Sequence, residues 1–172
     1  MAEDASDWLD LYLTAGITGV QTLHRYEDSY VFISVNSGTN LASLNHWAAE
    51  FSLVQDFPQL VSLRVLARII GDGGKSPDRE YGPYFETIVK NSADAFYTGA
   101  VREDDFWILK RYDGGDESFR EIYDFFILVS IDKDMFKAQM DQVLKDAAAG
   151  ISLTREQADA VSRLLESFYD GF

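Results

Sequence analysis

The 172-residue chain contains no cysteine and only two histidines. Without cysteine there is no disulfide framework, no thiolate nucleophile and no Cys-ligated zinc or iron–sulfur site. The two histidines, His24 and His46, also leave few ways to build a Ser–His hydrolase or a multi-histidine metal site. We therefore predict no catalytic residue, no metal and no cofactor, and we favour a function other than catalysis.

Basic residues are scarce, because 15 Lys and Arg stand against 29 Asp and Glu and give a formal net charge of −14. Nucleic-acid binding draws its affinity mainly from Lys and Arg that neutralise phosphates, so we expect no nucleic-acid partner. Docking on anionic lipid is disfavoured for the same reason. An acidic surface steers basic molecules toward it, and we therefore expect a protein partner of basic character.

Long hydrophobic runs are also missing. The longest apolar run, 125–129, has the length of a strand, whereas a membrane helix needs about 20 such residues. The acidic start, Met1-Ala2-Glu3-Asp4, lacks the basic region of a signal peptide. Two localisations stay open, a cytoplasmic protein and a mature exported domain whose signal has been removed. We expect residues 1–7 to form an acidic tether.

Apolar residues are nevertheless abundant, with 47% hydrophobic and 14% aromatic residues. This composition argues against disorder and predicts a core, and we expect a single domain over residues 1–172. Segments 30–35, 106–112 and 119–131 have the composition of strands, and a glycine-rich hairpin turn joins the last two. Helical patterns separate the first strand from the hairpin. We predict an α+β fold, with a small, mostly antiparallel three-stranded sheet packed with about five or six helices.

Capping and breaking residues predict where several helices begin and end. Thr39 or Asn40 can cap the helix that follows the first strand, and Pro58 suits the first turn of the next helix. Gly82-Pro83 begins a third helix, whose apolar spacing extends to Phe96 and which we expect to end at Gly99.

Three patterns suggest sites, each with a simpler alternative. Gly73-Gly74-Lys75-Ser76 resembles the end of a phosphate-binding loop, but Ile69 replaces the required glycine and a flexible loop is the better interpretation. The acidic clusters 103–105 and 113–117 do not match a calcium-binding loop, although calcium stays open. His46 and Glu50 can share a helix face. With nearby Trp47 they define the alternative function, a small-ligand or hydrolytic pocket near His46.

The return strand 119–131 has one wholly apolar face and one mixed face, and the mixed face holds Phe126 and Leu128. If helices leave that face uncovered, Phe32, Phe126 and Leu128 form an exposed patch, and such patches usually bind a partner. We therefore select Phe32, Trp107, Phe126 and Leu128 as candidate binding residues. The return strand is also a candidate edge for strand addition.

Four short segments carry a family resemblance: Asp7-Trp8-Leu9, residues 30–38, Asp105-Phe106-Trp107 and residues 123–132. They resemble segments of small bacterial envelope lipoproteins related to the N-terminal domain of flagellar assembly protein T, over about residues 7–149. The family's long alanine-rich helix is here split at Pro58, and the lipidation cysteine is missing.

The resemblance implies a lipoprotein domain that faces the periplasm or the outer surface, with an interaction or scaffold role and no known catalysis. Contact with the membrane would then occur only through a lipid anchor that this chain does not contain. Without the resemblance, a cytoplasmic acidic partner-binding protein is the remaining alternative.

Overall fold

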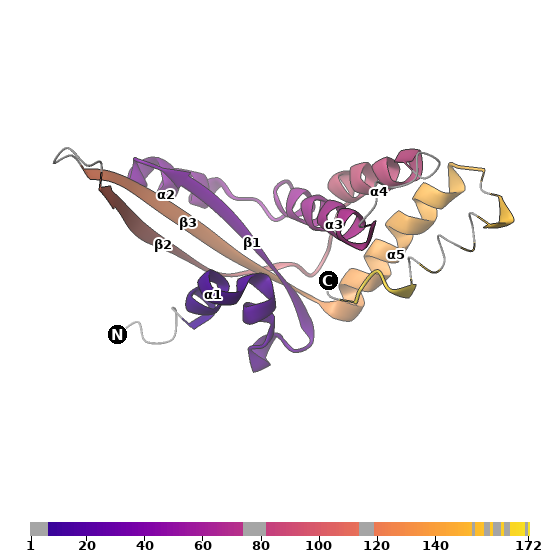
Figure 1. The fold of residues 1–172 in the computed structure, drawn as a ribbon, viewed down its shortest axis with the longest axis horizontal. Helices are drawn as coiled ribbons and strands as arrows, with labels where there is room; N and C mark the ends of the chain where they lie inside the picture. Colours follow the sequence, from indigo (N-terminus) through magenta and orange to yellow (C-terminus); the bar gives the residue numbers. More distant parts are fainter. Residues whose placement is uncertain are drawn as a thin grey trace. The chain divides into compact units, whose positions relative to one another are not determined.

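The computed structural model describes residues 7–73, 82–113, 119–152, 154–156, 159, 163, 166–170 and 172. The elements in chain order are α1 (Asp7–Gln21), the short 3-10 helix η1 (His24–Tyr26), β1 (Ser29–Gly38), α2 (Leu41–Glu50), α3 (Phe57–Gly73), α4 (Gly82–Asp94), β2 (Val101–Asp113), β3 (Phe119–Asp132) and α5 (Lys133–Ala149) (Figure 1). Over these residues the predicted α+β fold is confirmed, with five α-helices and a three-stranded antiparallel sheet.

The chain divides into two compact units, which we describe one at a time. The first comprises residues 1–57 and 99–133 and contains the whole sheet with α1 and α2. The second comprises residues 58–98 and 134–172 and is helical in its described part. A single domain over residues 1–172 stays a prediction.

The strand order in the sheet is β1-β3-β2, so β3 lies in the centre. It pairs antiparallel with β1 from Ser29↔Asp132 onward and with β2 through the hairpin. The expectation that the return strand is an open edge is therefore wrong, because β3 has a neighbour on each side. The edge strands of this sheet are β1 and β2, which lie on either side of β3 in Figure 1.

Helix α1 covers one face of the sheet. Its residue Tyr12 packs edge-on against Phe126, with ring centroids 5.9 Å apart. The buried cluster on this face brings α1 and η1 onto β1 and β3, and consists of Trp8, Leu9, Val20, Tyr26, Val31, Phe126 and Leu128. The mixed face of the sheet, which holds Phe126 and Leu128, is therefore buried in a hydrophobic core under α1.

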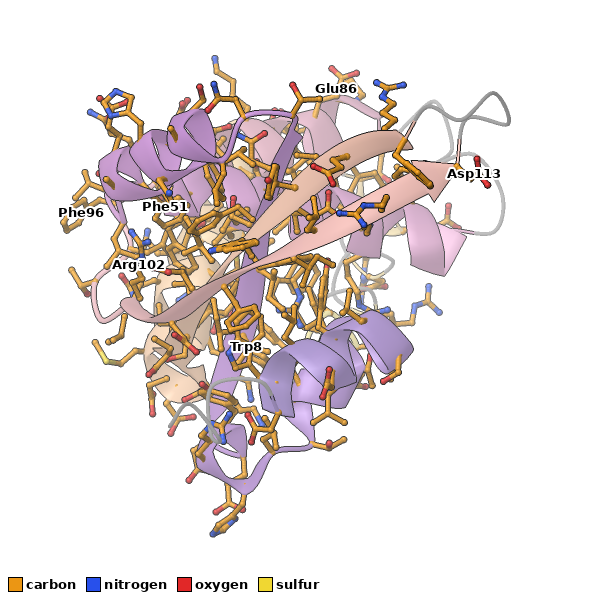
Figure 2. The ribbon with its side chains drawn as sticks, turned by 90° about the vertical axis from the view of Figure 1, so that its left-hand side faces the viewer. Trp8, Phe51, Glu86, Phe96, Arg102 and Asp113 are labelled. Atoms are coloured by element: carbon orange, nitrogen blue, oxygen red, sulfur yellow. The ribbon has the colours of Figure 1, made fainter. Side chains whose placement is uncertain are left out.

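Helix α2 covers the opposite face, as expected for a strand with a wholly apolar side. Asn40 caps it by accepting a 3.1 Å hydrogen bond from the Ser43 amide, as predicted. Trp47 then packs edge-on against Phe125, with centroids 6.2 Å apart. The helix is also tied to β2, because Arg102 donates a 2.6 Å hydrogen bond to the Ala48 carbonyl. The Arg102 guanidinium also lies 5.9 Å from the centre of the ring of Phe51, the residue after α2, and both side chains are labelled in Figure 2.

Two glycines shape α1. Gly16 has φ +67°, a conformation that most side chains avoid, and it kinks the helix. At Gly19 a Cβ would lie 2.7 Å from the Leu11 carbonyl oxygen, so only glycine allows the two halves of the helix to approach. The kink at Gly16 lets α1 continue across both glycines to Gln21.

The second unit packs α3, α4 and α5 around aromatic residues. Tyr97 stacks on Phe136 with centroids 5.9 Å apart, and its hydroxyl donates a 3.0 Å hydrogen bond to the Ser92 carbonyl. Burial raises the pKa of Tyr97 above its usual value. Helix α4 ends at Asp94, so the prediction that it continues through Phe96 to Gly99 is wrong, and Phe96 is exposed.

Strand β2 begins at Val101, five residues before the predicted start. A register irregularity lies between Arg102 and Asp104, and the acidic run 103–105 belongs to the strand. The acids are accommodated because β2 lies at the edge of the sheet, where charged side chains reach solvent. Residues 74–76 of the glycine-rich segment, residues 114–116 of the hairpin turn and residues 1–6 of the predicted tether lie outside the described residues. Two flanking residues differ from prediction, because Gly73 is the last residue of α3 and Asp7, expected in the tether, is the first residue of α1.

Candidate functional site

Three of the four candidate binding residues are buried. Phe32, Phe126 and Leu128 are 2%, 3% and 0% exposed, whereas Trp107 is 42% exposed. The expected exposed patch is therefore wrong for these three residues, because a helix covers each face of the sheet over the central part of β3. Among the four, only Trp107 offers a surface to a partner.

The strand register separates the four residues further. Phe32 lies opposite Val129, and Trp107 lies opposite Phe125. Directly opposed residues in an antiparallel pair point to the same face, while neighbours along a strand alternate. Phe32 and Trp107 are thus on the α2 side of the sheet, and Phe126 and Leu128 are on the α1 side. Sequence reasoning placed Phe32 with Phe126, because the register between β1 and β3 was unknown.

Trp107 belongs to an aromatic surface at the outer half of the β2–β3 hairpin. Leu109 pairs with Tyr123 and Asp113 pairs with Phe119 in the register, which places them on the same face as Trp107. Trp107 packs edge-on against Tyr123, with centroids 5.7 Å apart. We call this surface the hairpin face and define it by Trp107, Leu109, Phe119 and Tyr123.

The hairpin face is accessible and apolar. Leu109 is 40% exposed and Phe119 is 66% exposed. Scattered exposed apolar residues are ordinary on proteins, but apolar residues adjacent in one register form a patch. Phe119 and Leu109 carried no individual signal in the sequence, and only the hairpin register could have grouped them with Trp107.

Charged residues lie within the hairpin face and at one end of it. The Arg111–Glu121 pair stands between the Leu109–Tyr123 pair and Phe119 on the same side of the sheet. Arg111 donates two hydrogen bonds to Glu121 Oε1, at 3.0 and 2.7 Å, and its guanidinium lies 6.0 Å from the centre of the Phe119 ring. At the end near Trp107, Arg102 donates a 2.6 Å hydrogen bond to Asp105. Protein-docking surfaces usually combine apolar and polar groups in this way.

The reverse side of the hairpin is held by a buried carboxylate. Asp124 accepts a 2.6 Å hydrogen bond from the Ser37 hydroxyl and forms an ion pair with Lys110. Its burial acts to raise its pKa, but the hydrogen bonds from Lys110 and Ser37 outweigh burial and lower the pKa below the usual value. Residues of all three strands thus meet at Asp124, which fixes the hairpin against β1.

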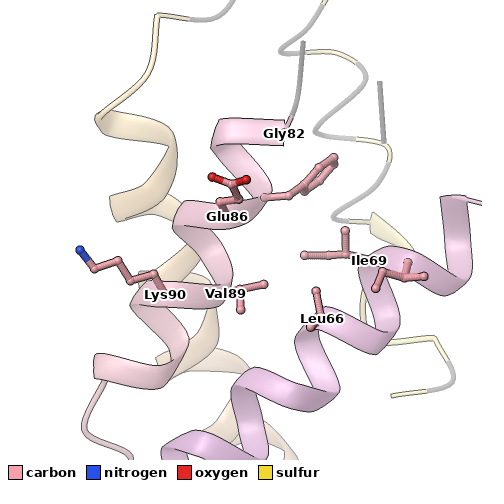
Figure 3. A pocket seen from close by; sticks show the side chains of 8 residues that line it. Leu66, Ile69, Gly82, Glu86, Val89 and Lys90 are labelled. Carbon is pink, nitrogen blue, oxygen red and sulfur yellow. The ribbon is translucent and has the colours of Figure 1, made fainter. Parts of the chain in front are cut away.

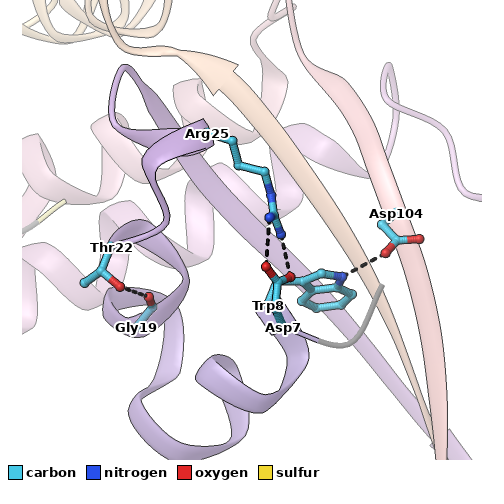
Figure 4. Close-up of polar contacts among 6 residues, drawn as sticks. All are labelled: Asp7, Trp8, Gly19, Thr22, Arg25 and Asp104. Carbon is cyan, nitrogen blue, oxygen red and sulfur yellow. Dashed lines mark hydrogen bonds and ion pairs between the residues drawn. The ribbon is translucent and has the colours of Figure 1, made fainter. Parts of the chain in front are cut away.

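A second polar contact joins α1 to β2. The indole Nε1 of Trp8 donates a 2.8 Å hydrogen bond to Asp104, and Trp8 is 1% exposed (Figure 4). The preceding residue, Asp7, accepts hydrogen bonds of 2.6 and 2.8 Å from the Arg25 guanidinium, and the Arg25 interaction lowers the pKa of Asp7. Both contacts fix the start of α1 and are structural.

The histidines offer no catalytic arrangement. The His24 and His46 side chains are 90% and 74% exposed, and each lies beside one glutamate of its own segment, Glu27 at 2.7 Å and Glu50 at 3.2 Å. Trp47, which we expected near a pocket, packs onto the sheet instead. Among the described residues no three His, Asp or Glu side chains are grouped to hold a metal ion.

A hollow does occur in the second unit, between α3 and α4. It has a volume of about 350 Å³ and is predominantly apolar (Figure 3). The lining residues are Leu66, Ile69 and Ile70 of α3, and Gly82, Phe85, Glu86, Val89 and Lys90 of α4. Its residues differ from those of the pocket expected near His46.

No protein-family model matches the chain, and no curated protein or solved structure matches it either. None of the helices in the described part of the chain is long and apolar enough to cross a membrane. The inference of function therefore depends on the geometry described above.

Proposed function

We propose that this chain is a non-catalytic binding domain that docks a protein partner on the hairpin face. The observation that supports this most directly is the exposed apolar group of Trp107, Leu109 and Phe119, which share one side of the hairpin. Apolar side chains that remain solvent-exposed on a well-packed sheet are typical of an interaction surface. Trp and Tyr are also the residues that most often dominate binding energy.

The partner we propose carries basic residues. The chain has a net charge of −14, which attracts a basic partner over long range and accelerates encounter. Glu121 and Asp105 lie on the hairpin face side of the sheet, where each already pairs with an arginine of β2 and can extend that pair to a basic partner. Aromatic rings add a second means of recognising a cation, since Lys or Arg can lie over the ring face.

We further propose that the domain belongs to an envelope lipoprotein. This proposal is supported by the four sequence segments that resemble the lipoprotein family, and not by the geometry. A reading of the upstream gene sequence tests it: a signal peptide that ends at a lipidation cysteine is expected. A preceding reading frame without such a signal would contradict the envelope location and favour a cytoplasmic acidic binding protein.

Co-purification tests the docking function. We compare the tagged wild-type chain with the double variant W107S/F119S and with L63S, in cells that naturally make the protein. Leu63 is 63% exposed on α3 and serves as a matched apolar control away from the hairpin. A partner that is retained by wild type and L63S and lost from W107S/F119S is expected. Equal retention by all three proteins would contradict docking on the hairpin face.

The α3–α4 hollow favours a second candidate function, the binding of a small apolar ligand. Its apolar lining suits a hydrocarbon group, and Lys90 at the edge can pair with a carboxylate. A medium-chain fatty acid is a suitable probe in calorimetry. Binding that is weakened by V89W, which fills the hollow, and by K90E supports this function, and no detectable heat with wild type contradicts it.

A further inference from the structure

The outer edge of β2 has no neighbouring strand in the part of the chain that the structure describes. The other sheet edge, β1, is closed over Ser29–Val31 by the side chain of Gln21, whose Nε2 donates to the Ser29 carbonyl and whose Oε1 accepts from the Val31 amide. An open strand edge presents backbone N–H and C=O groups that another strand can pair with. On β2 the Asp105 amide donates a 2.8 Å hydrogen bond to the Asp104 carboxylate, and the rest of its outer edge is available for strand addition over the described residues.

The charges along β2 are arranged so that the strand complements itself. Beyond the irregularity after Arg102, the strand begins with two acids, continues with four apolar residues and then has two bases, in the order Asp104-Asp105-Phe106-Trp107-Ile108-Leu109-Lys110-Arg111. In an antiparallel pair of two such strands, the acidic start of each copy meets the basic end of the other. No unrelated partner is needed to explain this pattern.

We propose that two copies of this chain pair antiparallel through the β2 edge, with Trp107 on the two-fold axis. This inference goes beyond the docking function, because it concerns the strand edge and a second copy. When two identical strands pair antiparallel, the two-fold axis is perpendicular to the sheet and passes between two copies of the same residue, which lie directly opposite each other. With Trp107 at the centre, Asp104 lies opposite Lys110 of the second copy, and Asp105 lies diagonal to Arg111 of the second copy, within reach of long side chains.

Two neighbouring registers are the alternatives. A pair centred on Phe106 would place Lys110 directly opposite Arg102 of the second copy, and like charges opposite one another destabilise a sheet. A pair centred on Ile108 would place Arg111 directly opposite Asp105 of the second copy and Lys110 diagonal to Asp104, so it also gives both bases an acidic partner. The two registers differ in the residue opposite Asp105, which is Leu109 in the Trp107 register and Arg111 in the Ile108 register.

The local charge of β2 opposes a second copy little. β2 has three basic and four acidic residues, so it contributes only −1 to the net charge of −14. Its bases are already oriented by acids of β3, Lys110 by Asp124 and Arg111 by Glu121. Acids of the second copy extend these pairs into networks, which contribute more than isolated surface pairs.

Cysteine trapping tests the register. Because the natural chain has no cysteine, any disulfide that forms must involve an introduced cysteine. We introduce Asp105→Cys and Leu109→Cys in separate full-length proteins. In the proposed pair, position 105 of one copy lies opposite position 109 of the other, at a Cα separation that suits a disulfide. Like positions lie four residues apart along the strands, about 13 Å, and cannot be bridged.

Mixing D105C with L109C is expected to give a disulfide-linked dimer that a reducing agent separates into monomers. Each protein alone is expected to run as a monomer on a non-reducing gel. Dimers that form as readily from either protein alone would overturn the proposed register. Absence of cross-linking in the mixture would overturn the Trp107-centred pair.

Sedimentation of the wild-type chain provides a second measurement, with a matched pair of charge variants. K110E places a carboxylate opposite Asp104 and is expected to weaken the dimer about tenfold. K145E makes the same charge change on the exposed side of α5 and is expected to leave dimerisation unchanged. A monomeric wild type, or equal weakening by both variants, contradicts the proposal, and thermal melting of K110E verifies that it folds.

Discussion

Trp8 and Asp104 lie 96 residues apart in sequence and are joined by a 2.8 Å hydrogen bond from the indole nitrogen to the carboxylate. The indole is 1% exposed, so its only polar atom is satisfied within the protein. The contact fastens the first helix to the edge strand of the sheet. It also assigns one of the three acids of the cluster 103–105 a structural role, where the sequence suggested a possible calcium ligand.

We predict that Asp104→Ala lowers the free energy of unfolding by about 1.5–3 kcal/mol, because it leaves the buried Trp8 N–H without an acceptor. Urea denaturation measures the change. Asp105→Ala is the control, since the exposed Asp105 side chain pairs with the half-buried Arg102, which keeps its bond to the Ala48 carbonyl, and it is expected to cost less than about 1 kcal/mol. Equal losses in the two variants would show that the Trp8 contact does not stabilise the fold.

Asp124 predicts a pH dependence of stability. Its folded-state pKa is lowered below the usual 3.8, so its ionised form stabilises the fold above about pH 4 and this stabilisation is lost as the pH falls below that value. Asp124→Asn is expected to lower the free energy of unfolding by about 1–3 kcal/mol at pH 7 and to reduce its loss on acidification. Asp10→Asn, at an exposed position of α1, is the control and should retain the wild-type slope. Parallel profiles for wild type and D124N would contradict this role of Asp124.

Two buried tyrosines predict opposite responses to loss of the hydroxyl. Tyr84 is 1% exposed and its hydroxyl has no hydrogen-bond partner among the described residues, while the hydroxyl of Tyr97 donates to the Ser92 carbonyl. Tyr84→Phe should therefore leave stability unchanged or raise it, and Tyr97→Phe should lower it by about 1 kcal/mol. Thermal denaturation of the two variants side by side checks this contrast, and the reverse order would refute it.

Because the two halves of α1 pack closely at Gly19, we expect that position to require glycine. Gly19→Ala is expected to lower the free energy of unfolding by about 1–3 kcal/mol, because its Cβ would lie 2.7 Å from the Leu11 carbonyl oxygen. Gly82→Ala, with no described atom within 4 Å of the added Cβ, should be tolerated within about 0.5 kcal/mol. Chemical denaturation distinguishes the two, and a tolerated alanine at position 19 would mean that α1 can relax.

The sequence predicted most of the fold because local signals agreed with one another. The three strands, the Asn40 cap and the helix start near Pro58 all follow from patterns within a few residues. The acidic start of β2 was missed because charge resembles a loop when the partner strand is unknown. Phe96 fits helical spacing, but α4 ends at Asp94 and leaves it exposed.

The candidate site was only partly predictable, for a reason that lies in strand register. Of the four candidate binding residues, Trp107 is exposed and its binding role stays a prediction, whereas Phe32, Phe126 and Leu128 are core residues. Which residues of different strands share a face depends on pairing between positions about 100 apart, and no local pattern encodes it. The same limitation concealed the hairpin face, whose four members become neighbours only when β2 pairs with β3.

Site-specific photo-crosslinking at the hairpin face is the most direct test of the proposed docking function. A photoreactive phenylalanine derivative at Phe119, which is 66% exposed, is compared with the same group at Leu63 on α3, which is 63% exposed. In cells that naturally make the protein, we predict a discrete adduct to a different protein from position 119 and none from position 63. An unmodified chain at both positions, or the same adducts from both, would contradict a docking surface on the hairpin.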